Sequence, residues 1–171
     1  MLRNAGIEFV VRPSDIPEVP FAGEGPREFG ERMAREKAHA ARRATCDPIL
    51  AADTVVAVGT EILGKPENAE DAKRMLRLLS NRTHEVITAV CLLGDGVEDV
   101  RSESTAVHFN AMTEPDIADY VASGEPMDKA GAYAIQGRAS RWISKIDGDY
   151  YNVVGLPVDL VWRMLREHKL I

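Results

Sequence analysis

Apolar and polar residues recur along this chain with two different periods, which predict helices and strands. The spacing near 3.6 residues predicts a helix over 27–44, with Phe29, Met33, Ala34 and Ala38 on its buried face. Charged residues fill the other faces of this segment. We therefore expect this helix to pack one side against a core and to expose the other.

Local signals predict three more helices. Asn68 and Thr113 are good N-cap residues, and they open predicted helices over 68–80 and 113–122. Pro157 stands in the first turn of a predicted C-terminal helix. These segments have apolar residues at helical spacing, so we expect each to bury one face.

Runs of aliphatic and β-branched residues predict the strands. The predicted strands cover 7–11, 49–52, 55–58, 85–93, 99–110, 142–146 and 151–154. Gly94-Asp95-Gly96 predicts a hairpin turn. Strands and helices alternate without regular βαβ repeats, so we expect one α/β domain over 1–171 with a mixed, strongly curved sheet and flanking helices.

The charge balance excludes some classes of partner. The 171 residues include 21 basic and 27 acidic side chains, which gives a net charge of -6. Broad binding to nucleic acid or to a membrane surface needs an extended basic face, so we expect neither. A small polyanion is still a possible ligand where a local basic cluster or a divalent metal supplies positive charge.

The sequence contains no sign of a membrane or secretory segment. No apolar run reaches the roughly 18 residues that a membrane span needs, and residues 1–6 have no signal-peptide core. They are typical of the last turn of a helix. Cys46 and Cys91 form no paired motif, which favours buried or free thiols in the cytoplasm.

The candidate chemistry centres on Asp53, which follows the apolar run 49–52. Such a position holds the backbone firmly and leaves the carboxylate at a strand junction. The alternative is that Asp53 caps a turn. Lys65 follows in a Gly-Lys-Pro cluster, and an acid and a base that return to one edge suit a phosphorylated ligand.

Common signatures of nucleotide-binding and hydrolytic proteins are absent. The chain has no P-loop, no Rossmann glycine motif, no His-Glu-x-x-His and no Gly-x-Ser-x-Gly. Its four histidines are scattered. Carboxylates, lysines and the glycine-rich segment 124–137 remain, and they suit metal-assisted attack of water on a phosphate ester or anhydride.

Five segments in order carry a resemblance to the Maf family of septum-formation-inhibitor-type nucleoside triphosphate pyrophosphatases. They are AADTVV (51–56), GKP (64–66), LSNRTHEVITAV (79–90), DKAGAYAIQG (128–137) and NVVGLP (152–157). The resemblance implies two lobes around a cleft, as in the inosine-triphosphate pyrophosphatases. It also implies cleavage of the α–β anhydride with Mg²⁺ or Mn²⁺, and it is compatible with a homodimer.

The same resemblance assigns roles to individual positions. Asp53 resembles the catalytic acid that takes the proton of the attacking water, and Glu18 resembles the acidic residue that lies with it at the metal. A nearby cation is expected to hold the pKa of Asp53 down. The positions that resemble substrate-binding residues are Thr54, Lys65, Gln136 and Lys37. From the residues alone, the better interpretation of Lys37 is an exposed helix lysine in an intrahelical ion pair, and that of Glu18 is a solvated loop acid.

The loop with Gln136 resembles the branch of the family that acts on dTTP and UTP, and we expect modified pyrimidine nucleotides as further substrates. An amide offers both a donor and an acceptor to a pyrimidine edge. A related pyrophosphatase with purine preference is the alternative, and it gains support if Gln136→Ala leaves pyrimidine selectivity unchanged.

The chain departs from the family pattern at its start. Family members begin with a strand and a Ser-x-Ser-Pro-Arg-Arg loop whose serine and arginine contact phosphates, whereas this chain begins inside the next helix. We therefore expect an N-terminally truncated domain, with unpaired neighbouring backbone and weak or no activity. The competing interpretation is a catalytically degenerate homologue that binds nucleotide or regulates septation.

Overall fold

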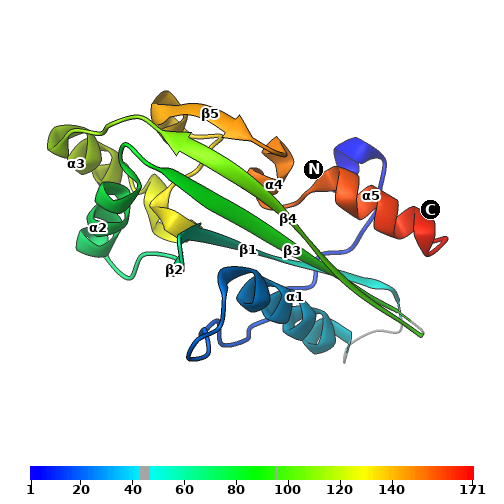
Figure 1. Cartoon of the computed structure of the whole chain (residues 1–171). Coiled ribbons are helices and arrows are strands. Elements are labelled where there is room, and N and C mark those ends of the chain that lie inside the picture. Colours follow the sequence, from blue (N-terminus) through cyan, green and yellow to red (C-terminus); the bar gives the residue numbers. More distant parts are fainter. Residues whose placement is uncertain (43–46, 95) are drawn as a thin grey trace.

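A single antiparallel sheet forms the centre of the molecule in the computed structural model, which describes residues 1–42, 47–94 and 96–171 (Figure 1). The strands are β1 (Ile49–Val58), β2 (Glu61–Leu63), β3 (Thr83–Gly94), β4 (Val97–Phe109) and β5 (Ile143–Asp147). Their order is β2-β1-β3-β4-β5. The α/β class with flanking helices is confirmed, but the expected mixture of strand directions is wrong, because all four neighbouring pairs in the described residues are antiparallel.

The helices surround this sheet near the predicted positions. They are α1 (Pro26–Arg42), α2 (Ala69–Leu79), α3 (Glu114–Ala122), α4 (Tyr150–Val154) and α5 (Val158–Glu167), with 3-10 turns η1 (Leu2–Ala5), η2 (Glu125–Asp128), η3 (Ala130–Ala132) and η4 (Arg138–Trp142). Asn68 and Thr113 cap α2 and α3 as predicted. The end of the helix predicted over 27–44 lies outside the described residues. Among the described residues, no helix has the length and apolar character to cross a membrane.

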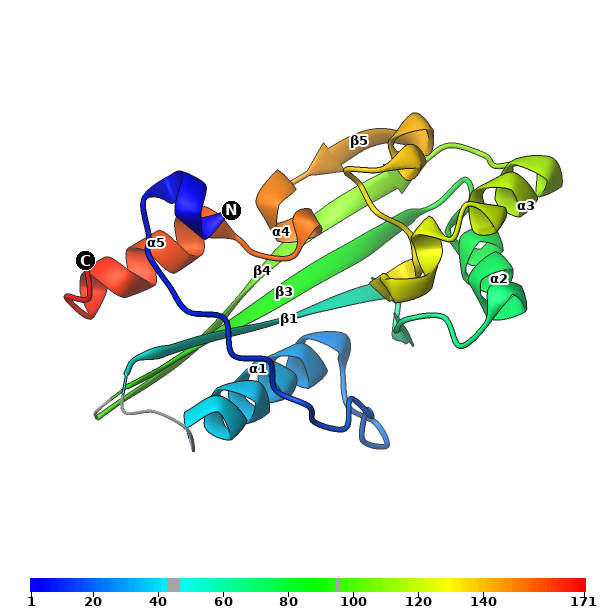
Figure 2. The same ribbon diagram turned by 180° about the vertical axis from the view of Figure 1, so that it is seen from behind.

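The side chains of the central strand β3 point alternately to its two faces, and both faces are buried. Ala89 and Cys91 pack with α1, whereas Val90 and Leu92 pack with α5. Figures 1 and 2 show α1 and α5 on opposite sides of the sheet. Cys91 is thus a buried thiol, as predicted, and burial raises its pKa to about 11. Cys46 lies outside the described residues.

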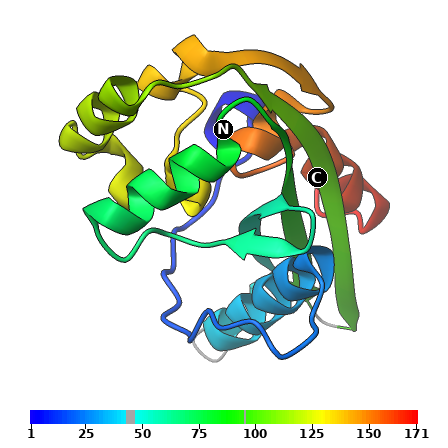
Figure 3. The same cartoon turned by 60° about the vertical axis from the view of Figure 1, so that its left-hand side comes forward.

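A third packed region closes the opposite end of the sheet. Figure 3 brings α2 and α3 forward, where they lie side by side over the end of β3 and β4. Tyr120 and Trp142 meet edge to face within this region, with their ring centroids 5.5 Å apart.

The segment 151–154 is helical, so the predicted strand there is wrong. Asp149 caps α4 by accepting a hydrogen bond from the backbone N–H of Tyr151, and Gly155 ends the helix with a left-handed φ of 118°. The buried side chain of Asn152 ties the helix to β3 and β4 through three hydrogen bonds. These tertiary contacts override the strand preference of Val153 and Val154.

The segment 7–11 forms no strand, which is a second wrong prediction. It runs from η1 near α5 past β1 toward α1 (Figure 2), and Val10 and Val11 are exposed. Within the described residues, the edge of β1 opposite β3 is paired only from Val56 to Val58, by β2. A cavity of about 730 Å³ borders the remaining edge.

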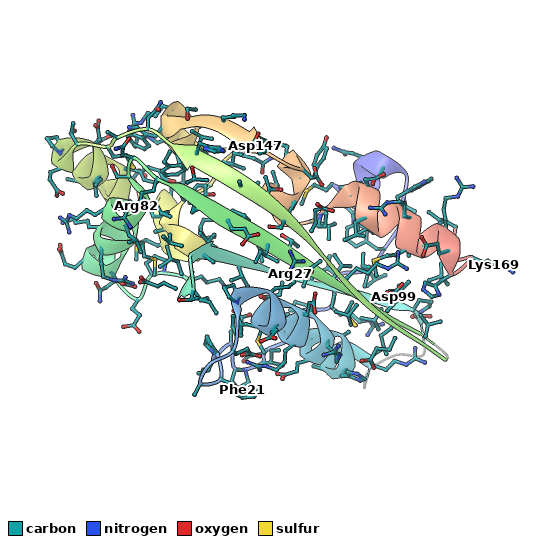
Figure 4. All side chains as sticks on the ribbon, viewed as in Figure 1. Phe21, Arg27, Arg82, Asp99, Asp147 and Lys169 are labelled. Atoms are coloured by element: carbon teal, nitrogen blue, oxygen red, sulfur yellow. The ribbon has the colours of Figure 1, made fainter. Side chains whose placement is uncertain are left out.

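Charged side chains fasten the C-terminal helix to the sheet. Asp99, labelled in Figure 4, lies on β4 and accepts hydrogen bonds from Arg101 and from the Nε2 atom of His168, just past the end of α5. Arg101 also contacts Glu167. This cluster complements the apolar contact between α5 and β3 and fixes the far end of the helix.

A buried histidine in an aromatic cluster makes the free energy of unfolding depend on pH. His84 is buried between Phe109 and Tyr133, and burial lowers its pKa from 6.5 to about 4. Between pH 6.5 and 4 the unfolded chain binds a proton that the folded chain does not. The free energy of unfolding should therefore fall by on the order of 3 kcal/mol from this residue as the pH drops through that range.

Chemical denaturation of His84→Gln at pH 7 and pH 4.5 measures this contribution, because glutamine does not titrate and can still bond to Tyr133. We expect a smaller loss of stability on acidification than in the unmodified chain. The same substitution at the exposed His39 is the control and should leave the loss unchanged. Equal losses in both variants would contradict the prediction.

Candidate active site

A cavity of about 520 Å³ lies at the β1 edge, next to the point where β2 begins to pair. It receives side chains from α1, β1, the turn after β2, the η2–η3 segment and α4. Six charged residues line it: Glu18, Lys37, Asp53, Lys65, Asp128 and Lys129. Three lysines facing three carboxylates in one cavity form a site that can hold a polyanion and activate a polar molecule beside it.

Asp53 stands in the middle of β1, and the strand continues through it. The prediction of a junction at this residue is therefore wrong, and the alternative of a turn cap is wrong as well. The side chain is 9% exposed. Its Oδ1 atom lies 2.5 Å from the Nζ atom of Lys37 on α1, and the same Nζ lies 2.6 Å from Oε1 of Glu18. One ammonium group thus joins two carboxylates from segments far apart in the sequence.

Burial and charge act on Asp53 in opposite directions. Burial raises the pKa of Asp53 above its ordinary value, and the hydrogen bond from Lys37 opposes this rise without cancelling it. The expectation that a cation holds this pKa down is therefore wrong in its net direction. For Lys37, burial would lower the pKa, but the bonds to Asp53 and Glu18 outweigh it, so the pKa is raised. A carboxylate whose pKa is raised suits a general base near neutral pH.

Lys65 and Lys129 reach the cavity from two segments that are fastened together. The backbone N–H of Gly131 donates to the carbonyl oxygen of Gly64 at 3.0 Å. Gly131 has a φ of 69°, and a Cβ atom there would lie 2.8 Å from Val56. Only glycine permits this close approach. Lys129 pairs with Asp128, whereas no carboxylate of the described residues pairs with Lys65, so its charge is available to a ligand.

Thr54 enters the cavity from the opposite face of the sheet. Successive side chains of a strand alternate, so Thr54 points away from α1. Its Oγ1 atom lies 2.9 Å from that of Thr88, the residue directly opposite on β3. Thr88 in turn contacts Asn152 of α4. Val153, Val154 and Gly155 complete this less polar part of the wall.

Gln136 lies outside the lining of this cavity. It stands exposed on a turn closed by the bond from the Gly137 N–H to the carbonyl of Ala134. Both carboxylate oxygens of Glu125 accept the backbone N–H of Arg138 and fix the turn. The structure therefore brings five of the predicted residues together, Glu18, Lys37, Asp53, Thr54 and Lys65, and places Gln136 apart from them.

The donor set near Asp53 suits a hard divalent cation only in part. Asp53 and Glu18 provide carboxylate oxygens, which Mg²⁺ and Mn²⁺ prefer. In the part of the chain that the structure describes, no three His, Cys, Asp or Glu residues gather as a metal site. Magnesium in phosphate-processing sites is commonly held by one or two carboxylates and by substrate phosphates. The residues present fit that arrangement.

With this geometry in view, comparison with known proteins gives the class of the chain. The family model described as Maf-like protein matches residues 1–168, so the chain belongs to the Maf family. A protein of Koribacter versatilis (strain Ellin345) is 50% identical over 97% of this chain and 86% of its own length. Relatives from Syntrophomonas wolfei and Acholeplasma laidlawii are 48% and 44% identical, over 96% and 100% of this chain and 89% and 91% of their own lengths. All three are named dTTP/UTP pyrophosphatase.

Several residues of the site escaped prediction. Asp128 and Lys129 lie in the glycine-rich segment that resembles the family, but no role was assigned to them. Thr88 and Asn152 are fully buried polar residues inside apolar runs. A threonine or asparagine in such a run is the available signal, because a buried polar group needs a partner.

The Lys37–Asp53 pair gives a test of the electrostatics. In Lys37→Met, Asp53 stays buried without its cation, and we expect the free energy of unfolding to fall by about 2 kcal/mol. Adding Asp53→Asn removes the unpaired charge and should recover part of that loss. Denaturation of the four members of this double-mutant cycle measures the coupling. Strictly additive effects would contradict the direct interaction.

Proposed function

We propose that this chain hydrolyses dTTP and UTP, and modified pyrimidine nucleotides, to the nucleoside monophosphate and pyrophosphate. The observation that carries the proposal is the buried Asp53 beside Lys37, in a cavity that Lys65 and Lys129 also line. Relatives of 44 to 50% identity that carry the name dTTP/UTP pyrophosphatase support the substrate class.

The reaction transfers the nucleotidyl group of the substrate to water. Asp53 accepts a proton from a water molecule whose oxygen bonds to the α-phosphorus, and the bond from that phosphorus to the α–β bridging oxygen breaks. The electron pair stays on the bridging oxygen, which leaves as part of pyrophosphate. Lys37 and Lys65 neutralise the phosphate oxygens and hold the triphosphate in place.

A divalent cation, Mg²⁺ or Mn²⁺, would be held by Asp53 and Glu18 together with substrate phosphates. When bound, it supplies positive charge at the phosphate oxygens. Lys37 contacts both carboxylates. We infer that the lysine turns toward the phosphates when substrate and cation enter, since the cation would then neutralise the two carboxylates in its place.

Base selection is assigned to two places in this proposal. Thr54 lines the cavity directly. Gln136 lies on an exposed turn outside the cavity lining and acts on the base only if that turn approaches the bound nucleotide. The cytoplasmic location stays a prediction from the cysteine pattern, and the homodimer stays a prediction from the family resemblance.

The central variant is Asp53→Asn, which keeps the shape of the side chain and removes the base. We expect kcat for pyrophosphate release from dTTP and UTP to fall at least about 100-fold, because general-base catalysis contributes factors of that size. The assay uses Mg²⁺ or Mn²⁺, the 171-residue chain, and a version extended at its N-terminus by the strand and Ser-x-Ser-Pro-Arg-Arg loop, which should turn over faster.

Nucleotide binding is measured for the same forms of the chain. Nucleotide binding without pyrophosphate release in every form would overturn the enzymatic proposal in favour of a nucleotide-binding protein. Undiminished turnover by Asp53→Asn would overturn the role of Asp53 alone.

The role of Gln136 is tested separately. In Gln136→Ala we expect kcat/KM for dTTP and UTP to fall relative to that for purine triphosphates, by about 10-fold for the loss of hydrogen bonds to the base. Glu125 and the turn backbone remain intact in this variant, so the change reports the side chain itself. Unchanged selectivity would favour base selection by the cavity wall and the purine-preferring alternative.

A further inference from the structure

Thr54 and Thr88 form a hydrogen bond whose direction the surrounding contacts determine. A threonine hydroxyl has one proton and can donate only once. The Thr88 Oγ1 atom lies 2.9 Å from the carbonyl oxygen of Asn152, which can only accept. Thr88 therefore uses its proton there. In the contact of 2.9 Å between the two hydroxyls, Thr54 must be the donor.

Asn152 is held so that this direction cannot reverse. Its Oδ1 atom accepts the backbone N–H of Thr88 at 3.0 Å. Its Nδ2 group donates to the carbonyl of Val86 and to the hydroxyl of Thr105, both at 2.9 Å. Turning the amide over would place its N–H group against the N–H of Thr88. Asn152 and Thr88 are both 0% exposed, so no bulk water can substitute for these partners.

The network also fixes α4 over the strand. Thr105 donates to the carbonyl oxygen of Asp149, and it accepts both the backbone N–H of the same residue and the Nδ2 group of Asn152. The carbonyl of Asn152 is thereby placed over Thr88. Every hydroxyl and amide proton between Thr105 and Thr54 has an assigned acceptor.

The consequence appears at the cavity wall. The Thr54 hydroxyl donates its hydrogen bond to Thr88, so it can offer a ligand only lone pairs. Gly155 leaves room beside it, because a Cβ atom there would lie 3.6 Å from the Thr54 Oγ1 atom. Val153 and Val154 line the same side. This side suits a flat base, whereas the lysines on the other side suit phosphates.

We propose that Thr88 and Asn152 are positioning residues that make the Thr54 hydroxyl a hydrogen-bond acceptor, so that the site selects bases with a ring N–H donor. Uracil and thymine carry such an N–H at N3, whereas the same position of cytosine is an acceptor. Cytosine would place lone pairs against the lone pairs of Thr54. The inference rests on the proposed function, since it assigns the base to this end of the cavity.

The test compares Thr88→Val with Thr88→Ser. Valine keeps the shape but lacks the acceptor for the Thr54 proton, whereas serine keeps the hydroxyl. We expect the unmodified chain to prefer UTP to CTP, measured both by kcat/KM and by calorimetric Kd values for the α,β-methylene analogues. Thr88→Val should reduce that preference about 10-fold, and Thr88→Ser should retain it.

The outcomes separate this inference from the proposed function. Folded Thr88→Val with unchanged preference, or an unmodified chain without preference, overturns the inference even if UTP is hydrolysed. Binding of the analogues with the expected preference but without hydrolysis overturns the function and supports the inference. No binding overturns both. If Thr88→Val does not fold, 3-methyl-UTP replaces it: binding equal to that of UTP overturns the inference, and binding about 10-fold weaker supports it.

Discussion

The carboxylate of Asp53 is placed where a strand interior meets an open edge, and the rest of the site depends on that position. Burial penalises its charge and raises its pKa. Lys37 offsets the penalty through a short ion pair. The net effect is a raised pKa, which makes the Asp53 carboxylate a stronger base than an exposed aspartate.

The alternation of side chains along β1 divides the cavity into two kinds of surface. Asp53 points toward α1 and meets Lys37, whereas Thr54 points toward α4 and meets Thr88. Two consecutive residues thus provide the acid and the neutral polar contact. A sheet edge is the natural place for such a site, because a ligand there can reach both faces of one strand. Gly131 has a left-handed backbone conformation, which keeps the segment that carries Lys129 close to this edge.

The sequence predicted the parts of the fold that are encoded locally. Asn68 and Thr113 mark the starts of α2 and α3 because capping is a local interaction. The strand prediction over 151–154 was wrong, because the helix there depends on hydrogen bonds from Asn152 to β3 and β4, which no local pattern reveals. The strand prediction over 7–11 was wrong as well. Its pattern suits a strand, but no strand among the described residues pairs with it.

The family resemblance proposed Glu18, Lys37, Asp53, Thr54 and Lys65 as site residues. The fold gathers all five around one cavity, and their roles stay predictions. Spacing alone could not place Lys37 beside Asp53, because that contact depends on how α1 packs on the sheet. The direction of the Asp53 pKa shift was also beyond reach, since it depends on how burial and the ion pair compare in size. Gln136 lies apart, on a turn whose position relative to the cavity is set by tertiary structure.

The most direct measurement is ³¹P NMR of the phosphorus products formed from dTTP or UTP by the purified chain with Mg²⁺. Cleavage at the α–β anhydride gives equal amounts of nucleoside monophosphate and pyrophosphate as first products. We expect that pair in both the 171-residue and the extended form wherever turnover occurs. Nucleoside diphosphate with inorganic phosphate would place the broken bond elsewhere and would contradict hydrolysis at the α–β anhydride.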